Sequence, residues 1–102
     1  MFIVKLTYKV ALNEVDKYLQ AHREFLDYHY QQGLFLASGP MKPRVGGILI
    51  ALTTDRAYLE SVLLQDPYAL ADIASHELIE FTPVKHRDEI KAIISQTEGK
   101  LC

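Results

Sequence analysis

NEVDKYLQAHREFLDYHYQQGLFLASGP, residues 13–40, combines a long helical pattern with a short apolar strand. Apolar side chains and two histidines recur every three or four residues in its first part, which predicts one amphipathic helix. Asn13 is suited to cap that helix, and Gly33 is suited to end it. A strand at residues 34–38 and a turn at residues 39–40 are expected to follow.

His22 lies in the middle of the apolar stripe of this helix. An imidazole in such a position is either a hydrogen-bonded core residue or the centre of a pocket. The spacing alone leaves both interpretations open.

Length and composition limit the class of protein. The chain has 102 residues, of which 49% are apolar and 24% charged, as is typical of one globular domain. No stretch approaches the roughly 20 apolar residues of a membrane span, and residues 1–4 lead into a strand without a signal-peptide pattern. We therefore expect a cytoplasmic protein without a membrane partner. A net charge of −2 with interspersed signs also argues against nucleic acid as a partner.

Cysteine and histidine spacing indicates no metal site. Cys102 is the single cysteine, for which we expect a free thiol. His29, His76 and His86 follow no metal-ligand spacing, so each is expected to have a structural or solvated role. Because a glycine-rich phosphate loop is also missing, we expect neither a metal nor a cofactor.

The remaining patterns complete an α+β domain. They predict strands at 2–8, 48–53 and 74–81, helices at 55–65 and 67–73, and a weaker helix at 86–96. Asp66 is suited to cap the short helix, with Pro67 at its first position. The order is that of a ferredoxin-like βαββαβ fold with an extra C-terminal helix. We treat residues 1–102 as a single domain, with a core at 1–85 and a C-terminal helix and tail at 86–102.

The second face of the sheet also needs cover. A ferredoxin-like sheet carries its helices on one face, yet the strand at 48–53 is apolar on both faces. A second copy of the chain can supply that cover. We expect a homodimer packed sheet to sheet through an open face that bears Ile3, Leu49 and Ala51.

Five pieces of the sequence together carry a family resemblance. They are His22 ahead of Gly33, the run LFLASGP at 34–40, the pair Gly46-Gly47 before an apolar strand, Asp66-Pro67-Tyr68, and LIEF at 78–81. As an ordered set they resemble the YciI-like (YCII-related) family of the dimeric α+β barrel group, over about residues 1–85. The resemblance implies a ferredoxin-like protomer, a homodimer and a cleft that holds a histidine and an aspartate.

The histidine and the aspartate of that cleft carry over to His22 and Asp66. The family's biochemistry is mostly unassigned, although acid/base chemistry on small molecules, including dehydrochlorination, is attributed to parts of it. A neutral imidazole can take and give a proton near neutral pH, and a carboxylate on its other nitrogen stabilises the cation. Asp66 can also cap its helix, because a carboxylate has two oxygens.

Five further residues are candidates for substrate binding. Ser38 offers a hydroxyl, Gly39 and Pro40 a pocket wall, Arg44 a positive charge, and Tyr68 a ring with a hydroxyl. Each also has a plain structural interpretation as part of a turn, a solvated loop or the core.

Two functions fit this pattern. The first is a small cofactor-independent enzyme of lyase, isomerase or dehydrochlorinase type, which uses the histidine and aspartate for acid/base chemistry on a small organic molecule. The second is a non-catalytic dimeric module that binds a small molecule or another protein. A plausible dyad favours the first, whereas the lack of a recognisable oxyanion donor favours the second.

Overall fold

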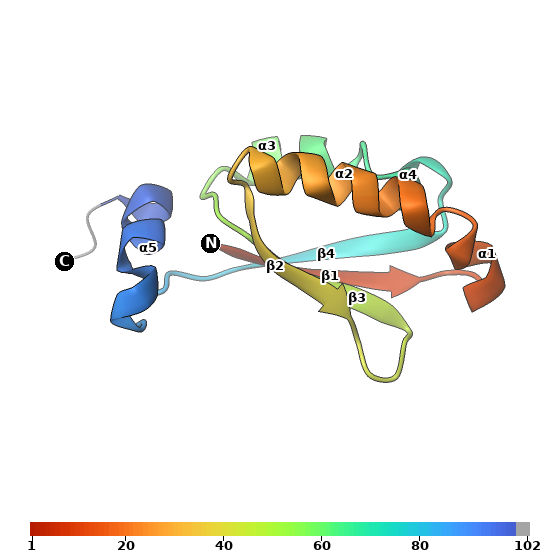
Figure 1. Cartoon of the computed structure of the whole chain (residues 1–102), viewed down its shortest axis with the longest axis horizontal. Coiled ribbons are helices and arrows are strands. Elements are labelled where there is room, and N and C mark those ends of the chain that lie inside the picture. Colours follow the sequence, from red (N-terminus) through yellow and green to blue (C-terminus); the bar gives the residue numbers. More distant parts are fainter. Residues whose placement is uncertain (100–102) are drawn as a thin grey trace.

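The computed structural model describes residues 1–99, so the expected free thiol of Cys102 lies outside the described residues. Its elements are β1 (Phe2–Tyr8), α1 (Leu12–Asp16), α2 (Leu19–Gln31), β2 (Phe35–Pro40), β3 (Gly46–Ala51), α3 (Arg56–Leu63), α4 (Pro67–Leu70), β4 (Ala74–Glu80), η1 (Asp88–Ile90) and α5 (Lys91–Glu98). The strands form one antiparallel sheet in the order β2-β3-β1-β4, and α2, α3 and α4 cover one face of it (Figure 1). The expected ferredoxin-like α+β fold with a C-terminal helix is confirmed. Within residues 1–99, no helix is both long and apolar enough to cross a bilayer.

The long helix predicted from residue 13 is two helices. The N–H of Tyr18 bonds to the carbonyl of Val15, three residues back, and Tyr18 leaves the helical conformation with a ψ of 2°. Asn13 lies inside α1, and Ala11 precedes the helix without a capping side chain. The break was not visible in the sequence because Val15 and Leu19 keep a four-residue spacing across it. Gly33 ends the helical stretch as predicted, with a φ of +79°.

The register of the strands decides which side chains lie beneath the helices. Phe2 pairs with Ala51 and Val4 with Leu49, and all four side chains are buried. The prediction that Leu49 and Ala51 lie on the open face was therefore wrong. That face instead carries the intervening residues Ile3, Lys5, Ile48 and Ile50, which pair as Ile3 with Ile50 and Lys5 with Ile48.

The predicted turn at residues 39–40 is part of strand β2. Gly39 pairs with Ile48 and Pro40 with Gly47, and β2 is an edge strand, where a proline lacking its N–H is tolerated. Strand β3 begins at Gly46, earlier than predicted. A Cβ on Gly46 would lie 1.8 Å from the carbonyl oxygen of Leu6, so β1 and β3 can approach here only because this residue is a glycine.

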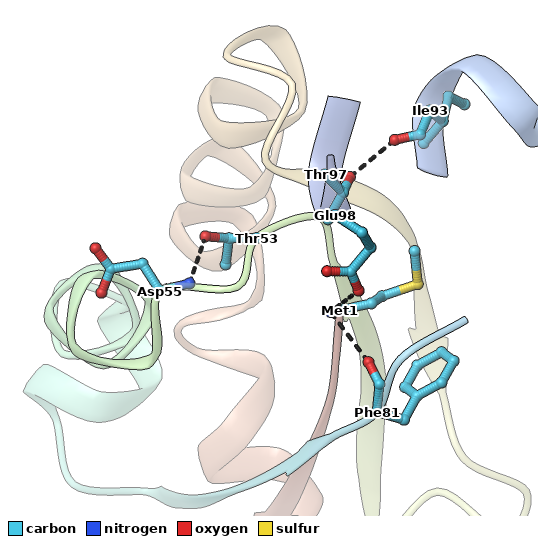
Figure 2. Close-up of polar contacts among 7 residues, drawn as sticks. All are labelled: Met1, Thr53, Asp55, Phe81, Ile93, Thr97 and Glu98. Carbon is cyan, nitrogen blue, oxygen red and sulfur yellow. Dashed lines mark hydrogen bonds and ion pairs between the residues drawn. The ribbon is translucent and has the colours of Figure 1, made fainter. Parts of the chain in front are cut away.

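The C-terminal helix α5 lies beyond the end of the sheet, apart from the helices that cover it (Figure 1). It begins at Lys91, later than predicted, and Ile94 is its buried residue. Its last residue, Glu98, accepts a hydrogen bond at 2.6 Å from the amino group of Met1, which also donates to the carbonyl of Phe81 at 3.2 Å (Figure 2). These two hydrogen bonds tie the C-terminal helix to the end of the sheet at which β1 begins.

Candidate functional site

His22 and Asp66 meet between α2 and the start of α4. The Nδ1 atom of His22 lies 2.8 Å from Oδ1 of Asp66, and the two side chains are 14% and 2% exposed. An ionised carboxylate can only accept, so Nδ1 carries the hydrogen that it donates. This tautomer leaves the lone pair on Nε2 of His22.

The cap of α4 fixes the position of the carboxylate. Asp66 precedes the helix with extended backbone angles, and its Oδ1 accepts the N–H of Tyr68 at 3.0 Å. Pro67 follows at the first helical position, where its missing N–H is no loss. The predicted cap is present, and one oxygen serves both the helix and the imidazole.

The surroundings of Asp66 favour its charged form. Burial, the largest single influence, raises the pKa of this carboxyl, but the hydrogen bond of His22, the nearby imidazole of His76, the charge of His22 and the N–H of Tyr68 outweigh it. The pKa of Asp66 is therefore lowered from its ordinary value. The carboxylate remains ionised at neutral pH although it is almost completely enclosed.

The ring of Tyr68 packs against the face of the His22 imidazole. The rings of His22 and Tyr68 are stacked, with centroids 3.9 Å apart and planes at 7°. Tyr68 is 1% exposed, and burial, helped by the neighbouring Tyr8, raises the pKa of its hydroxyl to about 12. That hydroxyl is buried and has no hydrogen-bond partner within residues 1–99. Tyr68 thus restricts the orientation of His22 through its ring.

A cavity of about 500 Å³ lies between α2 and the strands β1, β2 and β3. The seven residues singled out in the sequence all line it: His22, Ser38, Gly39, Pro40, Arg44, Asp66 and Tyr68. The Ser38 hydroxyl shares a 2.7 Å hydrogen bond with the hydroxyl of Tyr30. Arg44 donates to Asp16 at 2.6 Å and lies 5.9 Å from the centre of the Tyr8 ring. Their roles in binding a substrate remain predictions.

The family comparison covers most of the chain. The model of the YCII-related domain matches residues 1–82. The chain belongs to the YCII-related family. No curated protein matches it.

In this YCII-related domain, the match includes the whole sheet, the cavity and the pair of His22 and Asp66, whereas α5 lies outside it. The family confirms the resemblance seen in the sequence. Three or more His, Cys, Asp or Glu side chains do not come together as a metal site anywhere in the described part of the domain.

Sequence reasoning missed two features of the site in this YCII-related domain. The cavity is also lined by Arg23, Asp27 and Tyr30 of α2, which recur at intervals of four and three residues on a helix face beside that of His22. That shared face could have identified them. His76, expected to be structural or solvated, lies with its Nε2 3.8 Å from Oδ2 of Asp66. His76 and Asp66 belong to different elements, and no sequence pattern predicted that their side chains meet.

Proposed function

We propose that this protein is an enzyme that uses His22 and Asp66 for acid/base chemistry on a small organic molecule. One observation carries the proposal: a buried carboxylate lies 2.8 Å from Nδ1 of a histidine that lines a cavity of about 500 Å³. Pockets for small molecules commonly have volumes of about 300–1,000 Å³. Buried carboxylate–imidazole pairs in such pockets are typical of general acid/base sites.

The chemistry follows from the tautomer of His22. Nε2 takes a proton from a carbon of the substrate, while Nδ1–H remains bonded to Asp66. In a lyase or dehydrochlorinase, the electron pair of the broken C–H bond forms a carbon–carbon double bond as the leaving group departs with the electron pair of its own bond. In an isomerase, the pair is delocalised onto an adjacent carbonyl oxygen as an enolate, and Nε2 returns the proton to a different carbon. Asp66 stabilises the imidazolium that exists between these steps.

Solvent deuterium exchange tests this proposal without knowledge of the substrate. A panel of small carbon acids, comprising unsaturated lactones, 1,3-dicarbonyl compounds and β-chloroketones, is incubated with the protein in D₂O and followed by ¹H NMR. We expect the protein to accelerate exchange or elimination for at least one class. His22→Gln should reduce that rate by about 100-fold or more, the contribution of a positioned general base.

His86→Gln is the matched control, because His86 is exposed and lies on the segment before η1, outside the cavity. It should leave the rate unchanged. An active panel member that His22→Gln turns over at the parent rate would overturn the assignment of the base. Saturable binding in the cavity with no exchange across the panel would instead favour a non-catalytic binding module.

We also propose that the protein is a homodimer joined through its open sheet face. The proposal is supported by the apolar residues Ile3, Ile48 and Ile50 on that face, and by Ile79 of β4, which is 49% exposed. Lys5 and Glu77 pair across β1 and β4 on the same face and offer charges of both signs to a copy of themselves. A sheet face that exposes apolar side chains in this way is otherwise prone to aggregation.

Light scattering coupled to size-exclusion chromatography measures the oligomeric state directly. The parent should elute as a dimer at micromolar concentration, and Ile50→Glu should shift it to monomer because it places a charge at the centre of the interface. Leu64→Glu is the control, since Leu64 is 69% exposed next to α3 on the helical side. A monodisperse parent monomer would contradict the proposal.

A further inference from the structure

A second histidine, His76 of β4, lies near the other carboxylate oxygen of Asp66. His76 pairs with Leu6, a buried residue under the helices, so its side chain points to the helical face of the sheet. There its Nε2 faces Oδ2 of Asp66 at 3.8 Å, while Oδ1 is occupied by His22 and by the N–H of Tyr68. The carboxylate therefore has one imidazole in front of each oxygen.

The Nε2 atom of His76 is an unsatisfied polar atom. It is buried and has no hydrogen-bond partner in the part of the chain that the structure describes. A separation of 3.8 Å is too long for a hydrogen bond but short enough for an ion pair. Leaving the buried Nε2 of His76 unpaired is unfavourable, and a proton on Nε2 directed at Oδ2 gives it a charged partner. The His76 side chain is 13% exposed, so it can exchange protons with solvent more readily than Asp66, which is 2% exposed.

We propose that His76 is a positioning residue that directs an Nε2–H group at Oδ2 of Asp66, so that a single carboxylate lies between two imidazoles. This inference rests on the proposed function of the His22–Asp66 pair. A donor on Oδ2 draws electron density away from Oδ1. It thereby sets the strength of the hydrogen bond that orients His22.

The groups that face Asp66 come from three elements. They are His22 of α2, His76 of β4 and Tyr68 of α4, whose backbone N–H bonds to the carboxylate. Tyr68 stays protonated over the working range because its pKa is about 12. Changes in the titration of Asp66 between pH 2 and pH 8 therefore report on the two histidines.

The first test compares two substitutions of similar size, His76→Gln and His76→Leu. The glutamine amide can still donate to Oδ2, whereas leucine cannot. Followed by ¹³C NMR of the Asp66 carboxyl, the leucine variant should raise the pKa of Asp66, and the glutamine variant should raise it less. His86→Gln, at an exposed position, should leave it unchanged. Equal values in the parent and in His76→Leu would overturn the inference.

A second readout separates positioning from general structural support. Loss of the donor on Oδ2 should make Oδ1 a stronger acceptor, so the Nδ1–H proton of His22 should move downfield in His76→Leu. A loosened site would move it upfield or broaden it, which would contradict the inference. Should the leucine variant fold poorly, His76→Met provides the same measurement, because methionine also lacks a donor.

The same spectra distinguish this inference from the proposed function on which it rests. If Asp66→Asn leaves the Nδ1–H signal of His22 unchanged, the His22–Asp66 pair itself is wrong, and the proposed function fails with it. If Asp66→Asn moves that signal but His76→Leu does not, only the role of His76 is wrong.

Discussion

Replacing Asp66 with asparagine separates the two roles of this side chain, the helix cap and the charged partner of His22. Asparagine retains an oxygen for the N–H of Tyr68, 3.0 Å away in the parent, and caps helices about as well as aspartate. It removes the charge that faces His22 at 2.8 Å. Asp55→Asn is the matched control, because Asp55 caps α3 through the N–H of Tyr58, also at 3.0 Å, from an exposed position.

The expected loss follows from the hydrogen bond to His22. Hydrogen bonds to charged groups contribute about 1.5–3 kcal/mol to stability, and neutral ones about 0.5–1.5 kcal/mol. Removing the charge should therefore weaken the contact by about 1–1.5 kcal/mol, offset in part because a neutral amide is easier to bury. We expect Asp66→Asn to lower the free energy of unfolding by about 1 kcal/mol at pH 7, or about 4–8 °C in Tm. Asp55→Asn should change it by only a few tenths of a kcal/mol, roughly the difference between the two caps.

The difference between the parent and Asp66→Asn should also depend on pH. Because the folded-state pKa of Asp66 is lowered, the unfolded chain takes up this proton first as the pH falls. The stabilisation is therefore fully present above the unfolded value of about 3.9 and is lost as the pH falls through the folded pKa. Urea unfolding followed by far-UV circular dichroism suits a chain without tryptophan. It should be run at one protein concentration at pH 7 and at pH 3, since association would add to stability.

Two results would refute this reasoning. The first is an equal loss of free energy of unfolding in Asp66→Asn and Asp55→Asn at pH 7, which would mean that Asp66 acts only as a cap. The second is a difference in free energy of unfolding between the parent and Asp66→Asn that is no smaller at pH 3 than at pH 7. It would mean that folding does not favour the ionised carboxylate.

Two further substitutions test the core and the sheet. His29 is 6% exposed, its Nδ1 has no partner within residues 1–99, and burial lowers its pKa from 6.5, so parent stability should fall as the pH drops below about 6.5. His29→Phe should remove that part of the pH dependence in urea unfolding at pH 5 and pH 8, and an unchanged dependence would contradict the assignment. Gly46→Ala should lower the free energy of unfolding by about 3 kcal/mol or more, because its Cβ would lie 1.8 Å from backbone oxygen of Leu6. A variant that melts within a few degrees of the parent would show that β1 and β3 can separate here without loss.

Local signals predicted most of the fold because each has a local physical cause. Asp55 and Asp66 accept the N–H groups that open α3 and α4, and Gly33 has the positive φ that a helix end requires. None of these depends on distant residues. The break at Tyr18 has no such marker, since neither a proline nor a glycine lies near it.

The sequence could not predict which β3 side chains lie on which face of the sheet, because β3 is apolar at successive positions. Alternation distinguishes the two faces of a strand only where polar and apolar residues alternate. Here the pairing with β1 decides, and it buries Leu49 and Ala51 beneath the helices while Ile48 and Ile50 face the other way. That pairing depends on contacts between residues far apart in the chain.

The site was predictable only where a local pattern or the family resemblance marked a residue. His22 was marked by its position in an apolar stripe, and the family resemblance supplied Asp66 as its partner. His76 lies between Ala74 and Leu78 on the inward side of β4, so alternation predicts that it points toward the core. Its approach to Asp66 depends on where α4 lies above β4, which no local pattern specifies.

The cap explains why a buried charge can be kept in place at this site. A carboxylate on a flexible side chain would lose rotamer freedom on binding an imidazole, and this loss would weaken the contact. In Asp66 that freedom is already restricted, because Oδ1 is held by the N–H of Tyr68 and Pro67 fixes the backbone of the first turn. The ring of Tyr68 then stacks on His22 at 3.9 Å, so the same short helix positions both the carboxylate and the imidazole. A substitution that disrupts the first turn of α4 should therefore impair His22 even though it leaves both members of the pair unchanged.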